Sequence, residues 1–106
     1  MKVDVMTRSR GSAGVVFRMV DPFNFLAFDL NIEQGAKRIL KVENGNISVL
    51  KEIYDGGISQ NNWFKIFIRV EKTKFVIRCG DAKRYSSYTG LPIVFEFENS
   101  SFPKGE

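Results

Sequence analysis

The chain has 106 residues, enough for one domain with one hydrophobic core, and its net charge of +4 comes from basic residues interleaved with 12 acidic ones. This charge permits only weak attraction to nucleic acid, acidic lipid or sulfated sugar, because a solvated mixed-charge surface is the ordinary result of such a composition. Histidine is absent and Cys79 is the single cysteine, which excludes an intrachain disulfide, the commonest zinc ligand and the usual general base of Ser or Cys nucleophiles.

The dominant period of the chain is two, which favours strands over helices. Val3 to Met6 is a short candidate edge strand, and a polar, glycine-containing segment follows it. Two longer apolar runs lie at 15–20 and 25–32, and Asp21-Pro22 between them has the chemistry of a turn. No apolar run is long enough to span a membrane.

Asn44-Gly45 gives the strongest short-range hairpin signal, because both residues tolerate the positive φ of a type I′ turn. Leu40 and Val42 precede it, and Ile47 and Val49 follow it. This pattern predicts two antiparallel strands joined at the Asn-Gly pair.

The clearest alternation spans 63–71. A strand there places one set of side chains on a core face and most of the other set on the outer face. The two sets are Phe64, Ile66, Ile68 and Val70, and Trp63, Lys65, Phe67, Arg69 and Glu71. A polar turn at 71–74 then leads to Phe75, Ile77 and Cys79, so we expect Cys79 to be a buried apolar side chain.

The longest break between strands is the segment 80–92, which could hold a bulge or a short helical turn. Loops of that length are often functional. Beyond it, Ile93, Phe95 and Phe97 alternate with Val94, Glu96 and Glu98. About eight short strands at fairly regular spacing predict an all-β fold, a sandwich or a barrel.

Three segments, in order along the chain, resemble passages of the concanavalin A-like lectin/glucanase superfamily, which includes laminin G-like and thrombospondin C-terminal-like modules. They are 14–25 (GVVFRMVDPFNF), 62–70 (NWFKIFIRV) and 95–105 (FEFENSSFPKG). The resemblance implies an antiparallel two-sheet sandwich, a jelly roll, often extracellular and often adhesive or sugar-binding. It does not imply an activity, because this fold hosts many functions.

The chain is shorter than most domains of that superfamily and stops where the family would begin its closing strand. Residues 1–106 are therefore expected to be one such domain or its central portion. Without a closing strand, an open sheet edge could pair with another chain, so edge-strand self-association is one expected form of partnership.

A lectin-like site is the sharper functional hypothesis. Such sites stack an aromatic ring on a sugar and fix its hydroxyl groups with polar or charged side chains. The residues with this chemistry in or beside loops are Tyr54, Asp55, Arg84, Tyr85 and Tyr88. The alternative is that these tyrosines cover the ends of the sandwich, since a ring with a polar tip suits a half-buried position.

Catalysis has a weaker basis. Glu96 and Glu98 lie two apart on a strand and could form the carboxylate pair of a retaining glycosidase, but a solvated pair on an edge strand is the simpler interpretation. Asp29 is expected on the solvated face opposite Leu26 and Phe28. Trp63, which begins a strand, is expected to be a structural anchor.

Calcium and nucleic acid are two further ligand classes for which the sequence offers residues. Calcium would need folding to gather Asp21, Asp55 and Asp81, so no cofactor or metal is expected. Nucleic acid would need a basic, aromatic strip on one sheet face, which Lys65, Phe67 and Arg69, with Arg78 from a neighbouring strand, could supply.

The sequence thus predicts a non-enzymatic recognition or adhesion module, extracellular or secretory in its parent protein. Carbohydrate is the leading ligand class and protein the second. A glycoside-processing enzyme and a purely structural module remain as alternatives.

Overall fold

Eight antiparallel strands and no helix make up the parts of the chain that the computed structural model describes, residues 1–7, 12–54, 61–88 and 90–99. The strands are β1 (Lys2–Thr7), β2 (Ser12–Asp21), β3 (Asn24–Asn31), β4 (Ala36–Glu43), β5 (Asn46–Ile53), β6 (Asn62–Glu71), β7 (Lys74–Asp81) and β8 (Ile93–Glu98). The prediction of an all-β fold is confirmed. Within the described ranges, no helix has the length and apolarity needed to cross a membrane.

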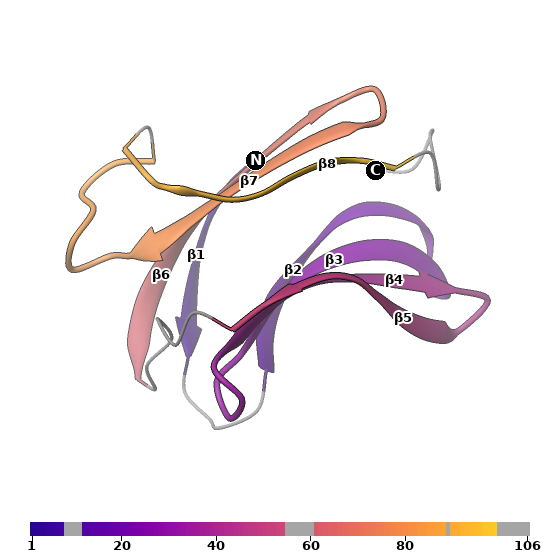
Figure 1. Cartoon of the computed structure of the whole chain (residues 1–106), viewed down its shortest axis with the longest axis horizontal. Helices are drawn as coiled ribbons and strands as arrows, with labels where there is room; N and C mark the ends of the chain where they lie inside the picture. Colours follow the sequence, from indigo (N-terminus) through magenta and orange to yellow (C-terminus); the bar gives the residue numbers. More distant parts are fainter. Residues whose placement is uncertain (8–11, 55–60, 89, 100–106) are drawn as a thin grey trace.

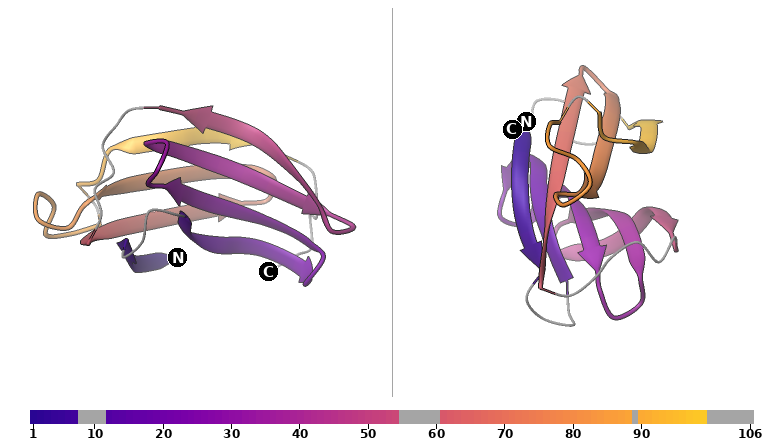
Figure 2. Two further views of the ribbon diagram at one scale, coloured as in Figure 1. Left: turned by 90° about the horizontal axis from the view of Figure 1, so that it is seen from below. Right: turned by 90° about the vertical axis from the view of Figure 1, so that its left-hand side faces the viewer.

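The strands form two four-stranded sheets that face each other across the core (Figure 1). One sheet has the order β1-β6-β7-β8 and the other the order β2-β3-β4-β5. The two further views separate these layers (Figure 2). The fold is therefore an antiparallel two-sheet sandwich, with β1, β2, β5 and β8 at the sheet edges.

Local turn chemistry builds the hairpins. Asn44 and Gly45 adopt φ values of 52° and 81°, as the Asn-Gly signal between β4 and β5 predicts. The carboxylate of Asp21 accepts a 2.8 Å hydrogen bond from the backbone N–H of Phe23, which closes the turn between β2 and β3. Lys72, with φ of 57°, makes the tight turn between β6 and β7.

The pairing of β1 with β6 joins two strands that are far apart in the sequence. Val3 lies opposite Ile66 although the intervening chain forms the whole of the other sheet. At one end of the pair, the amino terminus donates a 2.8 Å hydrogen bond to the carbonyl of Ile68. At the other end, the hydroxyl of Thr7 donates to the carbonyl of Asn62 at 3.1 Å. The expectation of an N-terminal edge strand is confirmed.

Aromatic side chains from both sheets meet in the core. The ring of Phe75 in β7 stacks on Phe97 at a centroid distance of 5.1 Å and meets the edge of Phe17 from β2 at 5.4 Å. The guanidinium of Arg18 lies over the same ring at 5.1 Å and donates to the carbonyl of Lys72 at 2.9 Å. Cys79 joins this core and is 3% exposed, as its strand parity predicts.

The outer face of the β2-β3-β4-β5 sheet carries two apolar rows that cross all four strands. The strand registers give one row as Met19, Phe25, Val42 and Ile47, and the other as Val16, Ala27, Leu40 and Val49. Ile47 and Val49 are exposed. This face is thus apolar over much of its width, in contrast to the outer face of the other sheet.

Asp29 corrects a sequence prediction. Its parity does put it on the outer face, but only 9% of the residue is exposed, so it is not a solvated side chain. Ser12 and Arg38 on the neighbouring strands flank it, and the hydroxyl of Ser12 donates to its Oδ2 at 3.4 Å. Burial raises the pKa of the Asp29 carboxyl above its usual value, and the hydrogen bond from Ser12 and the charge of Arg38 oppose this only in part.

Replacing Phe75 tests the core. Phe75→Ala should lower the free energy of unfolding by about 3–5 kcal/mol, because the substitution removes a fully buried ring and leaves a cavity. Urea denaturation measures this loss. Phe23→Ala, at a residue that is 64% exposed, is the matched control and should change stability by less than about 0.5 kcal/mol. Equal losses in the two variants would contradict the assignment of Phe75 to the core.

Replacing Asp29 tests its raised pKa. In the folded chain the Asp29 carboxyl keeps its proton at pH values where the same carboxyl in the unfolded chain, with a pKa near 3.8, has lost it. The stability of the wild type therefore falls as pH rises through the window just above that value, and Asp29→Asn removes this fall. The free energy of unfolding of Asp29→Asn minus that of the wild type should be larger at about pH 7 than at about pH 3. Urea denaturation at both pH values measures this difference. Asp29→Asn with the same stability difference from the wild type at both pH values would contradict the raised pKa of Asp29.

Candidate functional site

Alternate side chains of β6 and β7 face the core, so the remaining ones point out of the β1-β6-β7-β8 sheet. Ile66, Ile68 and Ile77 face the core, so Phe67 and Arg78 face outward. The register places Lys2 opposite Phe67 on one side, Phe67 opposite Arg78, and Arg78 opposite Ile93 on β8. One row thus crosses all four strands.

A second row lies beside the first. Arg69 on β6 is opposite Val76 on β7, and Val76 is opposite Glu96 on β8. Directly paired side chains on one face of an antiparallel sheet lie about 5 Å apart, and diagonal neighbours are still within reach of long side chains. The two rows therefore form one continuous surface with alternating apolar and charged members.

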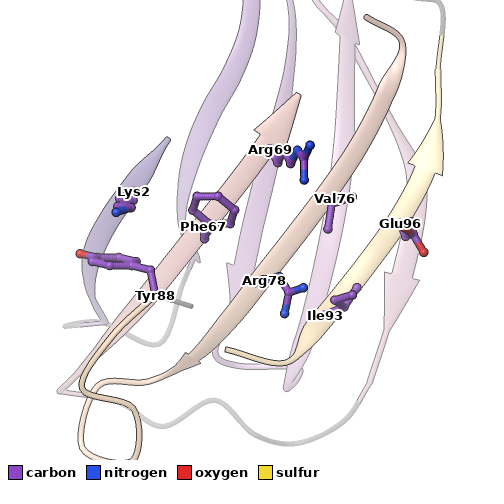
Figure 3. Close-up of a pocket in the computed structure, with 8 residues that line it drawn as sticks. All are labelled: Lys2, Phe67, Arg69, Val76, Arg78, Tyr88, Ile93 and Glu96. Atoms are coloured by element: carbon purple, nitrogen blue, oxygen red, sulfur yellow. The ribbon is translucent and has the colours of Figure 1, made fainter. Parts of the chain in front are cut away.

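Together with a tyrosine from the loop before β8, the two rows line a groove of about 590 Å³, which we call the outer-face groove (Figure 3). Its lining residues are Lys2, Phe67, Arg69, Val76, Arg78, Tyr88, Ile93 and Glu96. Figure 3 shows these side chains on one side of the sheet, with Lys2 and Tyr88 on the β1 side and Ile93 and Glu96 on β8.

Gly80 allows the loop between β7 and β8 to fold against the sheet. A Cβ atom at this position would lie 2.6 Å from Cδ2 of Tyr85 and 2.9 Å from Cδ2 of Leu91. The loop begins with a helical turn, in which the N–H groups of Arg84 and Tyr85 donate to the carbonyl of Asp81. The long break after β7 therefore contains a short helical turn, which is one of the two features that the sequence allowed there.

Tyr88 is fixed at the β1 end of the groove. Its hydroxyl donates a 2.6 Å hydrogen bond to Oδ1 of Asp4. The ammonium of Lys65 lies 4.7 Å from the ring centroid, and that of Lys2 lies 5.7 Å from it. The hydrogen bond to Asp4 raises the pKa of the Tyr88 phenol above its usual value, and desolvation adds to the effect. The phenol thus stays protonated and keeps its bond to Asp4 at neutral pH.

Arg78 is the most constrained cation of the groove. Its Nη1 donates a 2.8 Å hydrogen bond to the carbonyl of Leu91, which ties the sheet to the loop. A guanidinium has five N–H donors, so this bond leaves others available to a ligand. Arg69 is less constrained, because its side chain is 66% exposed and its Nη2 lies 3.5 Å from Oε2 of Glu71.

The residues predicted to bind a ligand are distributed over different places. Tyr88 lines the outer-face groove. Tyr85 packs against Gly80, as expected if it covers a loop base, and Arg84 is exposed beside it. Tyr54 is exposed just after β5, in the other sheet. Asp55 lies outside the described residues, so the proposed five-residue site stays untested as a unit.

The strip considered for nucleic acid does lie on one face. Phe67, Arg69 and Arg78 line the groove, and Lys65 lies one row further along β6, opposite Asp4 and Gly80. Parity identified these residues but not the remaining lining. Lys2 had no sequence signal, because it joins the groove only through long-range strand pairing. The alternation grouped Ile93 with Phe95 and Phe97, and this grouping is wrong: the bulge between β7 and β8 turns Ile93 outward, where it is 49% exposed.

The structure also gives the positions of the carboxylates considered for catalysis and for calcium, and of Trp63. Glu96 and Glu98 are both exposed on β8, and of the two only Glu96 lines the groove. Of the calcium candidates, Asp21 bonds to Phe23 and Asn24, and Asp81 bonds to Asn62. In the ranges the structure describes, no three acidic or sulfur ligands gather into a metal cluster. Trp63 lies on the groove's face of β6, opposite Met6, and is 48% exposed.

Gly80→Ala tests the contact that holds the loop in place. The added methyl group must displace Tyr85 and Leu91, so we expect a loss of about 1–3 kcal/mol in the free energy of unfolding. Gly90→Ala in the same loop is the matched control, because its added methyl group meets no atom within 4 Å. Thermal or urea denaturation compares the two variants. A Gly80→Ala protein as stable as Gly90→Ala would show that the loop does not pack as described.

Comparison with known proteins gives a likeness of fold. No protein family model matches the sequence, and no curated protein matches it. The structure is similar to that of the carbohydrate-binding module CBM66 from Bacillus subtilis, with a TM-score of 0.79 and 22% sequence identity. The match covers 96% of this chain and 59% of that chain, so this chain spans less than two thirds of that protein. The two proteins share a β-sandwich fold.

Proposed function

We propose that this chain is a non-enzymatic carbohydrate-binding module and that its ligand binds in the outer-face groove. The observation that carries the proposal is the cross-strand row in which the Phe67 ring lies between Lys2 and Arg78 on an open sheet face. The carbohydrate-binding module with a similar fold supports the same ligand class. So does the resemblance to concanavalin A-like domains, which also favours a module that meets its ligand outside the cell.

The groove matches the two-sided chemistry of a sugar. The C–H groups of a pyranose or furanose ring can pack on Phe67 and on the aliphatic groups of Val76 and Ile93. Hydroxyl groups can accept hydrogen bonds from Arg78 and donate to the carboxylate of Glu96. Because these side chains stand on paired strands of one sheet, they are largely positioned before the ligand arrives, which lowers the entropic cost of binding.

The groove offers poor support for hydrolysis. A retaining glycosidase needs one carboxyl group as acid and a second as nucleophile, about 5 Å apart on either side of the scissile bond. Among the described residues, Glu96 is the single carboxylate of the groove lining. A binding role for Glu96 therefore accounts for its position better than a catalytic role.

Replacing Phe67 tests the proposal. A glycan array should first identify bound carbohydrates, and isothermal titration calorimetry should then measure their affinity. Phe67→Ala should weaken binding by about tenfold to a hundredfold, because aromatic contacts of this kind contribute about 1–3 kcal/mol. The fold should be retained, since Phe67 points away from the core.

Tyr54→Ala is the matched control, because it removes an exposed aromatic ring outside the groove. It should leave the affinity unchanged. Loss of binding in Tyr54→Ala but not in Phe67→Ala would move the site to the end of β5, where one of the five residues predicted from the sequence lies. Binding of no carbohydrate by the wild type would reject the proposed function and favour a structural module or a protein partner.

A further inference from the structure

We infer that the outer-face groove selects acidic carbohydrates, those that carry a carboxylate or sulfate group, over neutral ones. This inference rests on the proposed function and specifies its ligand. Three cations line the groove, Lys2, Arg69 and Arg78, against the single carboxylate of Glu96. The lining thus carries a net charge of +2, which is half of the +4 of the whole chain.

The two arginines stand on adjacent strands of the same sheet face. Phe67 is opposite Arg78 and Arg69 is opposite Val76, so Arg69 and Arg78 are diagonal neighbours on adjacent strands. In Figure 3 the Arg69 side chain lies above, and the Arg78 side chain below, the level of Phe67 and Val76. Guanidinium groups match the planar geometry of a carboxylate and the oxygens of a sulfate, so they are suited to such a ligand.

Apolar groups lie next to these cations. Phe67 and Val76 complete the same two cross-strand pairs, so a sugar ring can pack on them while its acidic substituent reaches the guanidinium groups. Ile93 extends the apolar surface on β8 beside Arg78. The groove thus offers apolar side chains to the sugar rings and guanidinium groups to the acidic substituents of one saccharide.

The existing partners of the arginines leave room for a ligand. Arg78 is bonded to a neutral backbone carbonyl, that of Leu91, so its charge is not neutralised by that contact. The contact of Arg69 with Glu71 is long, at 3.5 Å, and both side chains are largely exposed. Exposed pairs of this kind contribute little and are readily exchanged for another anion.

Glu96 gives the groove a direction. It lies on β8 opposite Val76, while Lys2 lies on β1 at the other end of the first row. The acidic group of the ligand is therefore expected near the arginines and Lys2, with hydroxyl groups toward Glu96.

Nucleic acid fits the groove less well than an acidic saccharide, because stacking of successive bases needs several accessible aromatic rings. In the groove lining, Phe67 and Tyr88 are the two aromatic residues, and Lys65 already lies over the Tyr88 ring.

A matched pair of ligands tests the inference directly. The probes are an oligogalacturonate and its methyl ester, which share one sugar backbone and differ in charge, together with a sulfated oligosaccharide of the same length. The free acid or the sulfated probe should bind at least about tenfold tighter than the ester, the gain typical of a charge-assisted hydrogen bond. This preference should shrink as salt increases, because the site is exposed to solvent.

Charge variants locate the selectivity within the groove. Arg69→Gln should weaken binding of the acidic probe by about fivefold to tenfold and leave binding of the ester nearly unchanged. Glu96→Gln removes a like charge but keeps an acceptor oxygen for hydroxyl groups, so it should increase the preference for the acidic probe over the ester. Arg84→Gln is the matched control, since it changes the net charge equally at an exposed residue outside the groove lining, and it should have little effect.

The outcomes separate the two claims. Equal affinity for acid and ester, with both lost in Phe67→Ala, would overturn the acidic specificity and leave the carbohydrate-binding function intact. Equal weakening by Arg69→Gln and Arg84→Gln would also overturn it, because net charge rather than the groove would then be responsible. Tighter binding of a single-stranded oligonucleotide than of any saccharide would reject both claims.

Discussion

Burial of Ile66, Ile68 and Ile77 between the two sheets determines which side chains of β6 and β7 face outward. Successive side chains of a strand point to opposite faces, so each core contact has a fixed counterpart outside. A slip of β6 by one residue would bring Phe67 into the core, and a slip of β7 would bring in Arg78, so either slip would disrupt both the core and the groove. The stability of the sandwich and the geometry of the candidate site therefore depend on the same register.

The two outer faces of the sandwich have opposite character. The β2-β3-β4-β5 sheet presents apolar rows that include Val16 and Ile47, whereas the β1-β6-β7-β8 sheet presents cations around Phe67. A ligand that carries both charge and apolar C–H surface is suited to the second face. The groove on that face is bordered by β1 and by the loop after Gly80, which are far apart in the sequence.

Particular residues show how far sequence reasoning reached. Asn44-Gly45 and the alternation at 63–71 identified hairpins and a strand with the correct faces, because turn geometry and parity are local properties. Tyr88 was singled out as a loop aromatic and does line the groove. Asp29 was assigned to the correct face, but its burial was missed because parity does not show how closely Ser12 and Arg38 approach it.

By itself, the sequence determined most of the secondary structure and, away from the bulges, the side of the sheet on which the side chains lie. The spacing of apolar residues and the preferred φ of turn residues act over a few positions. Only the tertiary structure decided that Lys2 lies beside Phe67, that Ile93 and Glu96 complete the rows, and that Tyr88 bonds to Asp4. These neighbours are set by strand pairing across most of the chain, which depends on closing the common core and leaves no short-range pattern.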